Sequence, residues 1–184
     1  MATGTPEREL ETAVVLVLTQ FSAGLSELHA ELLAAAVARR IPLHLTLLYP
    51  FVPRPALGDD VNSALRRFFA GRPAPSFELT RIDEFPGILY AAPEPAETLV
   101  ELIEALAGAF PETPPYRGAY PEHVPHVSLA AVAEGAEQER VGAALRSTAA
   151  SLLPVRCEIT YASLLEESEP HCWRERERFP FAGR

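Results

Sequence analysis

Residues 43–49 read Leu-His-Leu-Thr-Leu-Leu-Tyr, an apolar run interrupted by one imidazole and one hydroxyl. Because side chains alternate between the two faces of a β-strand, Leu45 and Leu47 are expected to share the face that packs into the core. His44 and Thr46 then project together from the other face. An imidazole beside a hydroxyl on such a strand needs polar partners inside the protein or a position that lines a cleft.

The same arrangement occurs again 82 residues further along, where residues 125–129 read Pro-His-Val-Ser-Leu. Val127 and Leu129 are expected to face the core, and His126 and Ser128 to project together from the opposite face. One such pair is explained equally well by a core histidine with satisfied hydrogen bonds. Two pairs in matching positions favour a shared cleft. The imidazoles are then expected to lie roughly 5–8 Å apart, so that each can hydrogen-bond an oxygen of the same bound phosphate.

The predicted elements around the two motifs also occur twice in the same order. Apolar spacing indicates strand–helix–strand–helix–strand over about 13–84 and again over about 88–164, with a closing strand at about 172–181. The pattern predicts helices near 25–36, 58–71, 99–110 and 140–153, and a single strand over 155–164. We expect one α+β domain over 1–184, with a flexible tail at 1–12. Two pseudo-symmetric lobes, each an antiparallel-type sheet with helices on the outside, would face each other across a central cleft.

The absence of lysine excludes several enzyme classes. All 16 basic residues are arginines. This excludes the Gly-Lys-Ser/Thr phosphate loop, the kinase strand lysine, the Schiff base with pyridoxal phosphate and the lysyl-adenylate of ATP-driven ligases. A formal net charge of −9 argues against binding a long nucleic-acid duplex through many phosphates. A small anion held by a few arginines remains compatible with this composition.

The start of the sequence indicates where the protein resides. The acidic residues before the apolar run 13–18 lack the basic region of a signal peptide, and the run is too short for a membrane span. We therefore expect a cytoplasmic monomer with no membrane partner. In that compartment Cys157 and Cys172 are expected to be reduced thiols.

Two histidines and two hydroxyls in one cleft suit phosphoryl transfer without a metal or any other cofactor. One neutral imidazole, His44 or His126, can remove a proton from water or a hydroxyl, while the other, protonated, delivers a proton to the departing oxygen. An unperturbed histidine pKa of about 6.5 suits both roles. The hydroxyls of Thr46 and Ser128 can donate hydrogen bonds to the non-bridging phosphate oxygens.

These residues resemble the signature of the two-histidine (2H) phosphoesterases, which include bacterial 2′-5′ RNA ligases and 2′,3′-cyclic phosphodiesterases. That signature is two His-x-Thr/Ser-hydrophobic tetrapeptides, here residues 44–47 and 126–129, each on a core strand of one lobe. Tyr-Pro-Phe at residues 49–51 also resembles the family. The resemblance implies a substrate that is a small nucleotide or an RNA 3′ end with a cyclic phosphate. Ligation without ATP, as the reverse of transesterification, agrees with the missing lysine.

Further candidates for substrate binding lie outside the two motifs. Tyr116, Arg117 and Tyr120 belong to a Pro- and Gly-rich connection that could close over a nucleotide, or could be an ordinary exposed loop. Arg174 lies on the closing strand as a candidate phosphate contact, although its interleaved glutamates are equally typical of a solvated edge strand. His123 precedes the second motif, but without an obvious third ligand we expect no metal site.

The sequence therefore predicts a metal-independent phosphoesterase that hydrolyses, or reversibly transesterifies, 2′,3′-cyclic phosphate ends of nucleotides or short RNA, with 2′-5′ RNA ligation as the same chemistry in reverse. Two alternatives stay open. One is a non-catalytic nucleotide- or phosphate-binding protein on the same fold. The other is a phosphodiesterase for another cyclic nucleotide.

Overall fold

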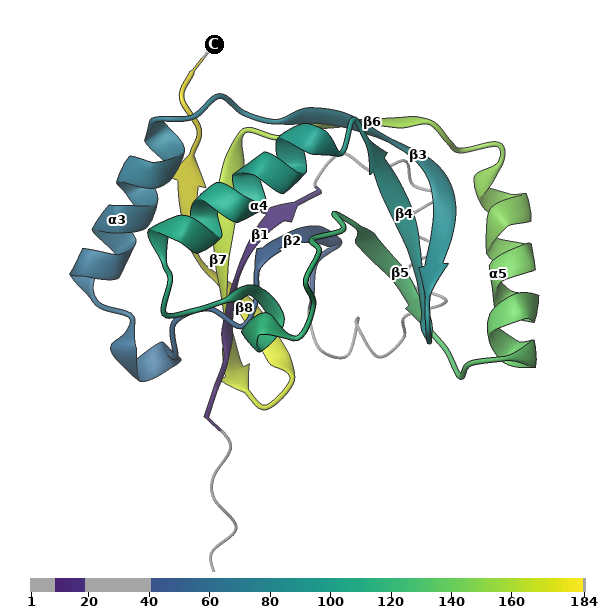
Figure 1. Ribbon diagram of the computed structural model, residues 1–184, viewed down its shortest axis with the longest axis horizontal. Coiled ribbons are helices and arrows are strands. Elements are labelled where there is room, and N and C mark those ends of the chain that lie inside the picture. Colours follow the sequence, from purple (N-terminus) through teal and green to yellow (C-terminus); the bar gives the residue numbers. More distant parts are fainter. Residues whose placement is uncertain (1–8, 19–40, 184) are drawn as a thin grey trace, which may run out of the picture.

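The computed structural model describes residues 9–18 and 41–183, and Figure 1 shows them as two sheets with flanking helices. The predicted helix at 25–36 lies outside the described residues. Within the described part of the chain, no helix is both long and apolar enough to cross a membrane.

Two four-stranded sheets, antiparallel throughout, form the framework of the molecule (Figure 1). The first has the order β2-β1-β7-β8, with strands β1 (Thr12–Val17), β2 (His44–Leu48), β7 (Tyr161–Glu169) and β8 (Cys172–Pro180). The second has the order β5-β4-β3-β6, with strands β3 (Ser76–Phe85), β4 (Ile88–Glu94), β5 (Val127–Ala131) and β6 (Val155–Glu158). The predicted α+β class with two sheet-based lobes is confirmed.

Three α-helices of the described chain cover these sheets. α3 (Asp59–Ala70) packs against β8, α4 (Glu97–Ala109) against β2, and α5 (Ala136–Ala149) against β3 and β4 (Figure 1). Two short 3-10 helices, η1 (Arg54–Ala56) and η2 (Pro115–Gly118), lie in the connections. Each α-helix forms because its apolar residues recur at helical spacing; in α3, for example, Leu65, Phe68 and Phe69 are buried together.

Strands β3 to β6 of the second sheet are inserted between β2 and β7 of the first, so the two sheets do not coincide with consecutive halves of the chain. β3 falls within the predicted unit 13–84, yet it pairs with β4 and β6 of the second sheet. The single strand predicted over 155–164 is wrong, because it comprises β6 in the second sheet and β7 in the first. Buried Ile159 continues the apolar pattern through the crossing. No turn residue therefore marks the place where the chain changes sheet.

Two other predicted boundaries also differ from the structure. α5 spans 136–149 rather than 140–153, because the helix begins directly after Gly135, whose φ of 86° is not helical, and the chain turns after Ala149. The predicted boundary of the flexible tail, at residue 12, is wrong. Thr12 is fully buried in β1, and its hydroxyl donates to the carbonyl of Val52. Residues 1–8 lie outside the described residues.

The two faces of the first sheet pack against different parts of the molecule. On β1, Val14 and Leu16 belong to the main hydrophobic core. Ala13 and Val15 lie on the other face, in a small apolar cluster with Leu165. This second face is the one that contributes residues to the cavity described below.

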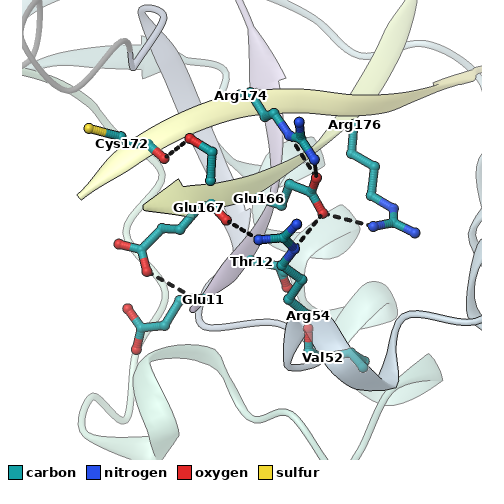
Figure 2. Close-up of polar contacts among 10 residues, drawn as sticks. Glu11, Thr12, Val52, Arg54, Glu166, Glu167, Cys172, Arg174 and Arg176 are labelled. Atoms are coloured by element: carbon teal, nitrogen blue, oxygen red, sulfur yellow. Dashed lines mark hydrogen bonds and ion pairs between the residues drawn. The ribbon is translucent and has the colours of Figure 1, made fainter. Parts of the chain in front are cut away.

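A buried carboxylate ties the β7–β8 hairpin to η1 (Figure 2). Glu166 accepts hydrogen bonds from Arg174 at 2.8 and 2.6 Å and from Arg176 at 2.8 Å, and Arg54 lies 3.7 Å away. Burial alone would raise the pKa of Glu166, but the hydrogen bonds and charges of Arg176 and Arg174 outweigh it and lower the pKa below its ordinary value. The ionised carboxylate thus holds three arginines from two segments.

Glu166→Gln should lower the free energy of unfolding at pH 7 by about 1.5–3 kcal/mol, because it removes hydrogen bonds between charged groups at a buried position. The lowered pKa means that the stabilisation is present above the unfolded-state pKa of the carboxyl and is lost as the pH falls through the folded-state value. Urea unfolding at pH 7 and at decreasing pH measures both effects.

The matched control for this prediction is Glu177→Gln. Glu177 pairs with one arginine, Arg66, which is exposed. Loss of this ion pair should lower the free energy of unfolding by less than about 1 kcal/mol. Equal effects of the two substitutions would contradict a special role for Glu166.

Candidate active site

The first histidine motif lies on β2 at the wall of a cavity. Leu45 and Leu47 are buried, whereas His44 and Thr46 are half-buried. His44 and Thr46 line a cavity of about 700 Å³, to which buried Leu47 also contributes. Pairing of Val17 with His44 and of Val15 with Thr46 fixes the register of β2 on β1. The alternation predicted from the sequence is confirmed for this strand.

The second motif, on and just before β5, lines the same cavity. Val127 and Leu129 are buried, and His126 and Ser128 are half-buried residues of the cavity wall. β2 and β5 belong to different sheets, yet Cα atoms of the two strands approach within 8 Å. The four motif residues therefore converge on one cavity between the sheets. The separation of the two imidazoles stays a prediction.

Both histidines are oriented by the same type of hydrogen bond. Nδ1 of His44 lies 2.7 Å from the carbonyl oxygen of Pro42, and Nδ1 of His126 lies 2.8 Å from that of Val124. A carbonyl only accepts, so Nδ1 carries the proton and donates it in both rings. In the neutral imidazole Nε2 is then the nitrogen that can take a proton from a ligand.

Aromatic rings surround His126 on the side of the second sheet. Its ring packs edge-to-face against Phe85 and Tyr90, with centroid distances of 5.2 and 5.5 Å. Phe85 and Tyr90 stack on each other at 4.4 Å. Burial lowers the pKa of His126 below its ordinary value, and the hydrogen bond to Val124 offsets only part of this effect. His126 is therefore predominantly neutral at pH 7.

A chain of aromatic side chains forms another wall of the cavity. Trp173, Tyr49, Tyr116 and Tyr120 follow one another with edge-to-face contacts, at centroid distances of 6.1, 6.3 and 5.4 Å. Tyr120 is 60% exposed, so its ring is open to solvent at the cavity wall. These rings offer flat apolar surfaces on which a planar group can stack.

The connection that carries Tyr116 is held in an unusual backbone conformation. Tyr116 and Arg117 both have positive φ angles, 50° and 55°, which non-glycine residues rarely adopt. The amide of Tyr116 donates to the carbonyl of Tyr49 on the strand side of the cavity. Burial raises the pKa of the Tyr116 phenol, and a hydrogen bond with Thr46 offsets part of that rise. Tyr116 is thus fixed beside a motif hydroxyl.

The structure does not bring the two candidate arginines to the cavity wall. Arg117 is largely exposed and donates to Glu11 at 2.6 Å. Arg174 donates from two nitrogens to Glu166 (Figure 2). Strand alternation places Glu166 and Glu167 on opposite faces of β7, and of the two only Glu167 lines the cavity. Both arginines therefore form ion pairs within the protein, and their assignment to substrate binding stays a prediction.

Several cavity residues were not predicted from the sequence. Phe85 comes from the β3–β4 turn, Trp173 from β8, and buried Glu167 from β7. They come from segments far apart in the chain, so no local motif marks them. His123 and His171 also line the cavity. Within the described residues, no group of three or more His, Cys, Asp or Glu side chains is placed to hold a metal ion.

Comparison with known proteins identifies one matching family. The family described as the 2′-5′ RNA ligase superfamily matches residues 17–170, which include both histidine motifs. No curated protein matches the sequence significantly.

Solved structures resemble this fold along almost the whole chain. TT0787 of Thermus thermophilus has a TM-score of 0.60 at 19% identity, covering 94% of this chain and 98% of its own. E. coli LigT in complex with 3′-AMP has a TM-score of 0.58 at 14% identity, covering 96% and 100%. LigT in complex with ATP has a TM-score of 0.54 at 12% identity with the same coverage. At these identities the resemblance establishes the fold alone.

Phe85→Ala should raise the pKa of His126 toward 6.5, because water replaces the ring that now shields the imidazole. NMR titration of the His126 ring protons measures the change. Phe110→Ala is the matched control, since Phe110 packs on Phe51 and does not line the cavity. An unchanged His126 pKa in Phe85→Ala would show that this ring does not cause the shift.

Proposed function

The chain belongs to the 2′-5′ RNA ligase superfamily, and from this premise we propose that it is a metal-independent phosphoesterase acting on 2′,3′-cyclic phosphate ends of nucleotides or short RNA. The observation that carries the proposal is the convergence of His44, Thr46, His126 and Ser128 on one cavity. Two proton-transfer groups and two hydroxyl donors are the groups that such a reaction requires from the protein.

In the proposed hydrolysis, the two histidines have complementary roles. His126 is the general base, because its lowered pKa favours the neutral imidazole at pH 7. Nε2 of His126 takes a proton from the attacking water as the new P–O bond forms. The bond from phosphorus to one ribose oxygen breaks, and protonated His44 delivers a proton to that oxygen. In ligation an RNA 5′-hydroxyl takes the place of water: its oxygen attacks phosphorus and gives its proton to His126, while His44 protonates the departing ribose oxygen. In the reverse reaction that ribose hydroxyl attacks phosphorus, the 5′-oxygen leaves, and the two histidines exchange roles.

Thr46 and Ser128 would bind the non-bridging phosphate oxygens. Each shares a strand face with its histidine, so a phosphate in contact with both imidazoles lies within reach of both hydroxyls. Hydroxyl donors positioned by the strands in this way stabilise charge that develops on the phosphate with little reorganisation during the reaction.

The aromatic wall supports a nucleoside as the group attached to the phosphate. The rings of Tyr116 and Tyr120, beside Tyr49 and Trp173, can stack on a planar base. That LigT has been solved with 3′-AMP is compatible with a nucleotide in the equivalent cavity. We propose the small nucleotide, or the terminal nucleotide of an RNA strand, as the substrate class.

His44→Ala and His126→Ala should each abolish most turnover of 2′,3′-cyclic nucleotides, because each removes one of the two proton transfers. Ligand Kd should change little, since the hydroxyls and aromatic rings remain. For the wild type, kcat against pH should be bell-shaped, with apparent pKa values that belong to the coupled pair. A panel of 2′,3′-cyclic nucleotides, 2′-5′ dinucleotides and 3′,5′-cyclic nucleotides identifies the substrate.

His123→Ala is the comparison variant, because His123 lines the cavity without belonging to either motif and should affect turnover less. Unaltered turnover in both motif variants would show that their histidines are structural. No turnover in the wild type on the whole panel, together with nucleotide binding, would favour the binding-protein alternative.

Thr46→Val and Ser128→Ala should each lower kcat by roughly 10² to 10³, because each deletes one donor to the phosphate and leaves the proton transfers in place. Steady-state kinetics on the cyclic nucleotide measure the loss. Thr148→Val, on the outer surface of α5, is the control and should leave kcat unchanged. A loss as large as that of the histidine variants would indicate that the hydroxyls do more than bind the phosphate.

A further inference from the structure

The turn at the tip of the β3–β4 hairpin is not of a type that two-residue hairpins favour. Phe85 pairs with Ile88, so Pro86 and Gly87 form a two-residue loop. Gly87 has a φ of 75°, and proline followed by a glycine with positive φ is the combination typical of a type II turn. Two-residue hairpins favour types I′ and II′, whose twist matches that of the strands. The tip therefore needs support from elsewhere in the fold.

Gln138 of α5 supplies that support. Its Nε2 donates to the carbonyl of Phe85 at 2.9 Å, and its Oε1 accepts from the amide of Gly87 at 2.8 Å. The Gln138 side chain is 8% exposed, so water has little access to these bonds. The amide of Val132 donates to the carbonyl of Gly87 at 2.9 Å and ties the tip to the end of β5.

The supported tip also forms part of the candidate active site. Phe85, Pro86 and Ile88 all line the cavity. The Phe85 ring stacks on Tyr90 and makes a T-shaped contact with the ring of His126. A displacement of the Phe85 backbone would therefore move a ring that contacts the imidazole.

We propose that Gln138 is a positioning residue for His126: its two hydrogen bonds fix the β3–β4 tip and thereby hold the Phe85 ring against the imidazole. Gln138 does not line the cavity, so it acts through Phe85 rather than on the substrate. The consequence for the rate rests on the proposed function. The consequence for the protonation of His126 does not, because it follows from contacts within the protein.

A merely structural role for Gln138 makes a different prediction. Loss of two buried hydrogen bonds lowers the Tm under either role, whether or not the β3–β4 tip moves. Only a positioning role also changes the environment of His126. The other histidines and carboxylates that line the cavity are His44, His123, His171, Glu122 and Glu167. None of them is altered by a substitution at Gln138, so they are common to every variant compared.

The test compares Gln138→Met, which keeps the length of the side chain without its polar atoms, with Asn62→Leu. Asn62 is a buried amide of equal exposure, 8%, on α3 of the other lobe, and it does not line the cavity. NMR titration of His126 and Tm are measured on both full-length variants. Gln138→Met should raise the His126 pKa toward 6.5, as Phe85→Ala does, whereas Asn62→Leu should leave it unchanged.

The rate gives a second, separate measurement. Gln138→Met should lower kcat on the substrate that the panel identifies by about 10- to 10²-fold, and shift the pH profile together with the His126 pKa. Gln138→Asn, whose shorter amide cannot span both partners, serves where the methionine variant does not fold. A lower Tm with an unchanged His126 pKa would overturn the proposal. A shifted pKa in a protein without phosphoesterase turnover would support the positioning role and contradict the proposed function.

Discussion

Strand alternation in β2 and β5 is the constraint on which the candidate site depends. The pairing that buries Leu45 and Leu47 is the same pairing that turns His44 and Thr46 toward the cavity. A slip by one residue would reverse the two faces of the strand and turn His44 and Thr46 toward the core. Packing energy that stabilises the fold therefore also maintains the register of the proposed catalytic groups.

The two histidines are oriented by the same type of backbone hydrogen bond. Each ring donates through Nδ1 to the carbonyl of the residue two positions earlier. His126 also lies against Phe85 and Tyr90, which exclude water from part of its ring. This burial lowers the pKa of His126 below its ordinary value and favours its neutral form.

The sequence was sufficient to predict the elements that carry periodic patterns, but not the paths between them. Alternation around His44 and His126 predicted which side chains face the cavity, because that pattern is local. The crossing at Ile159 was missed, since a buried residue there continues the apolar pattern. The ion pair of Arg174 was not predicted, because its partner, Glu166, becomes its neighbour only when β7 and β8 pair. Contacts between distant segments, such as Phe85 with His126, have no signature in a single sequence.

The insertion of one sheet into the chain of the other has a mechanical consequence. Strands β3 to β6 of the second sheet follow one another between β2 and β7 of the first, and α4, between β4 and β5, packs back on β2. The chain therefore enters and leaves the second sheet at two points, before β3 and after β6, so this sheet cannot rotate freely about a single hinge. The two connections and the packing of α4 limit the opening of the cleft and fix the span between its walls. The first sheet is complete only when β7 pairs with β1 across the whole insertion, and closing so long a loop favours slow folding.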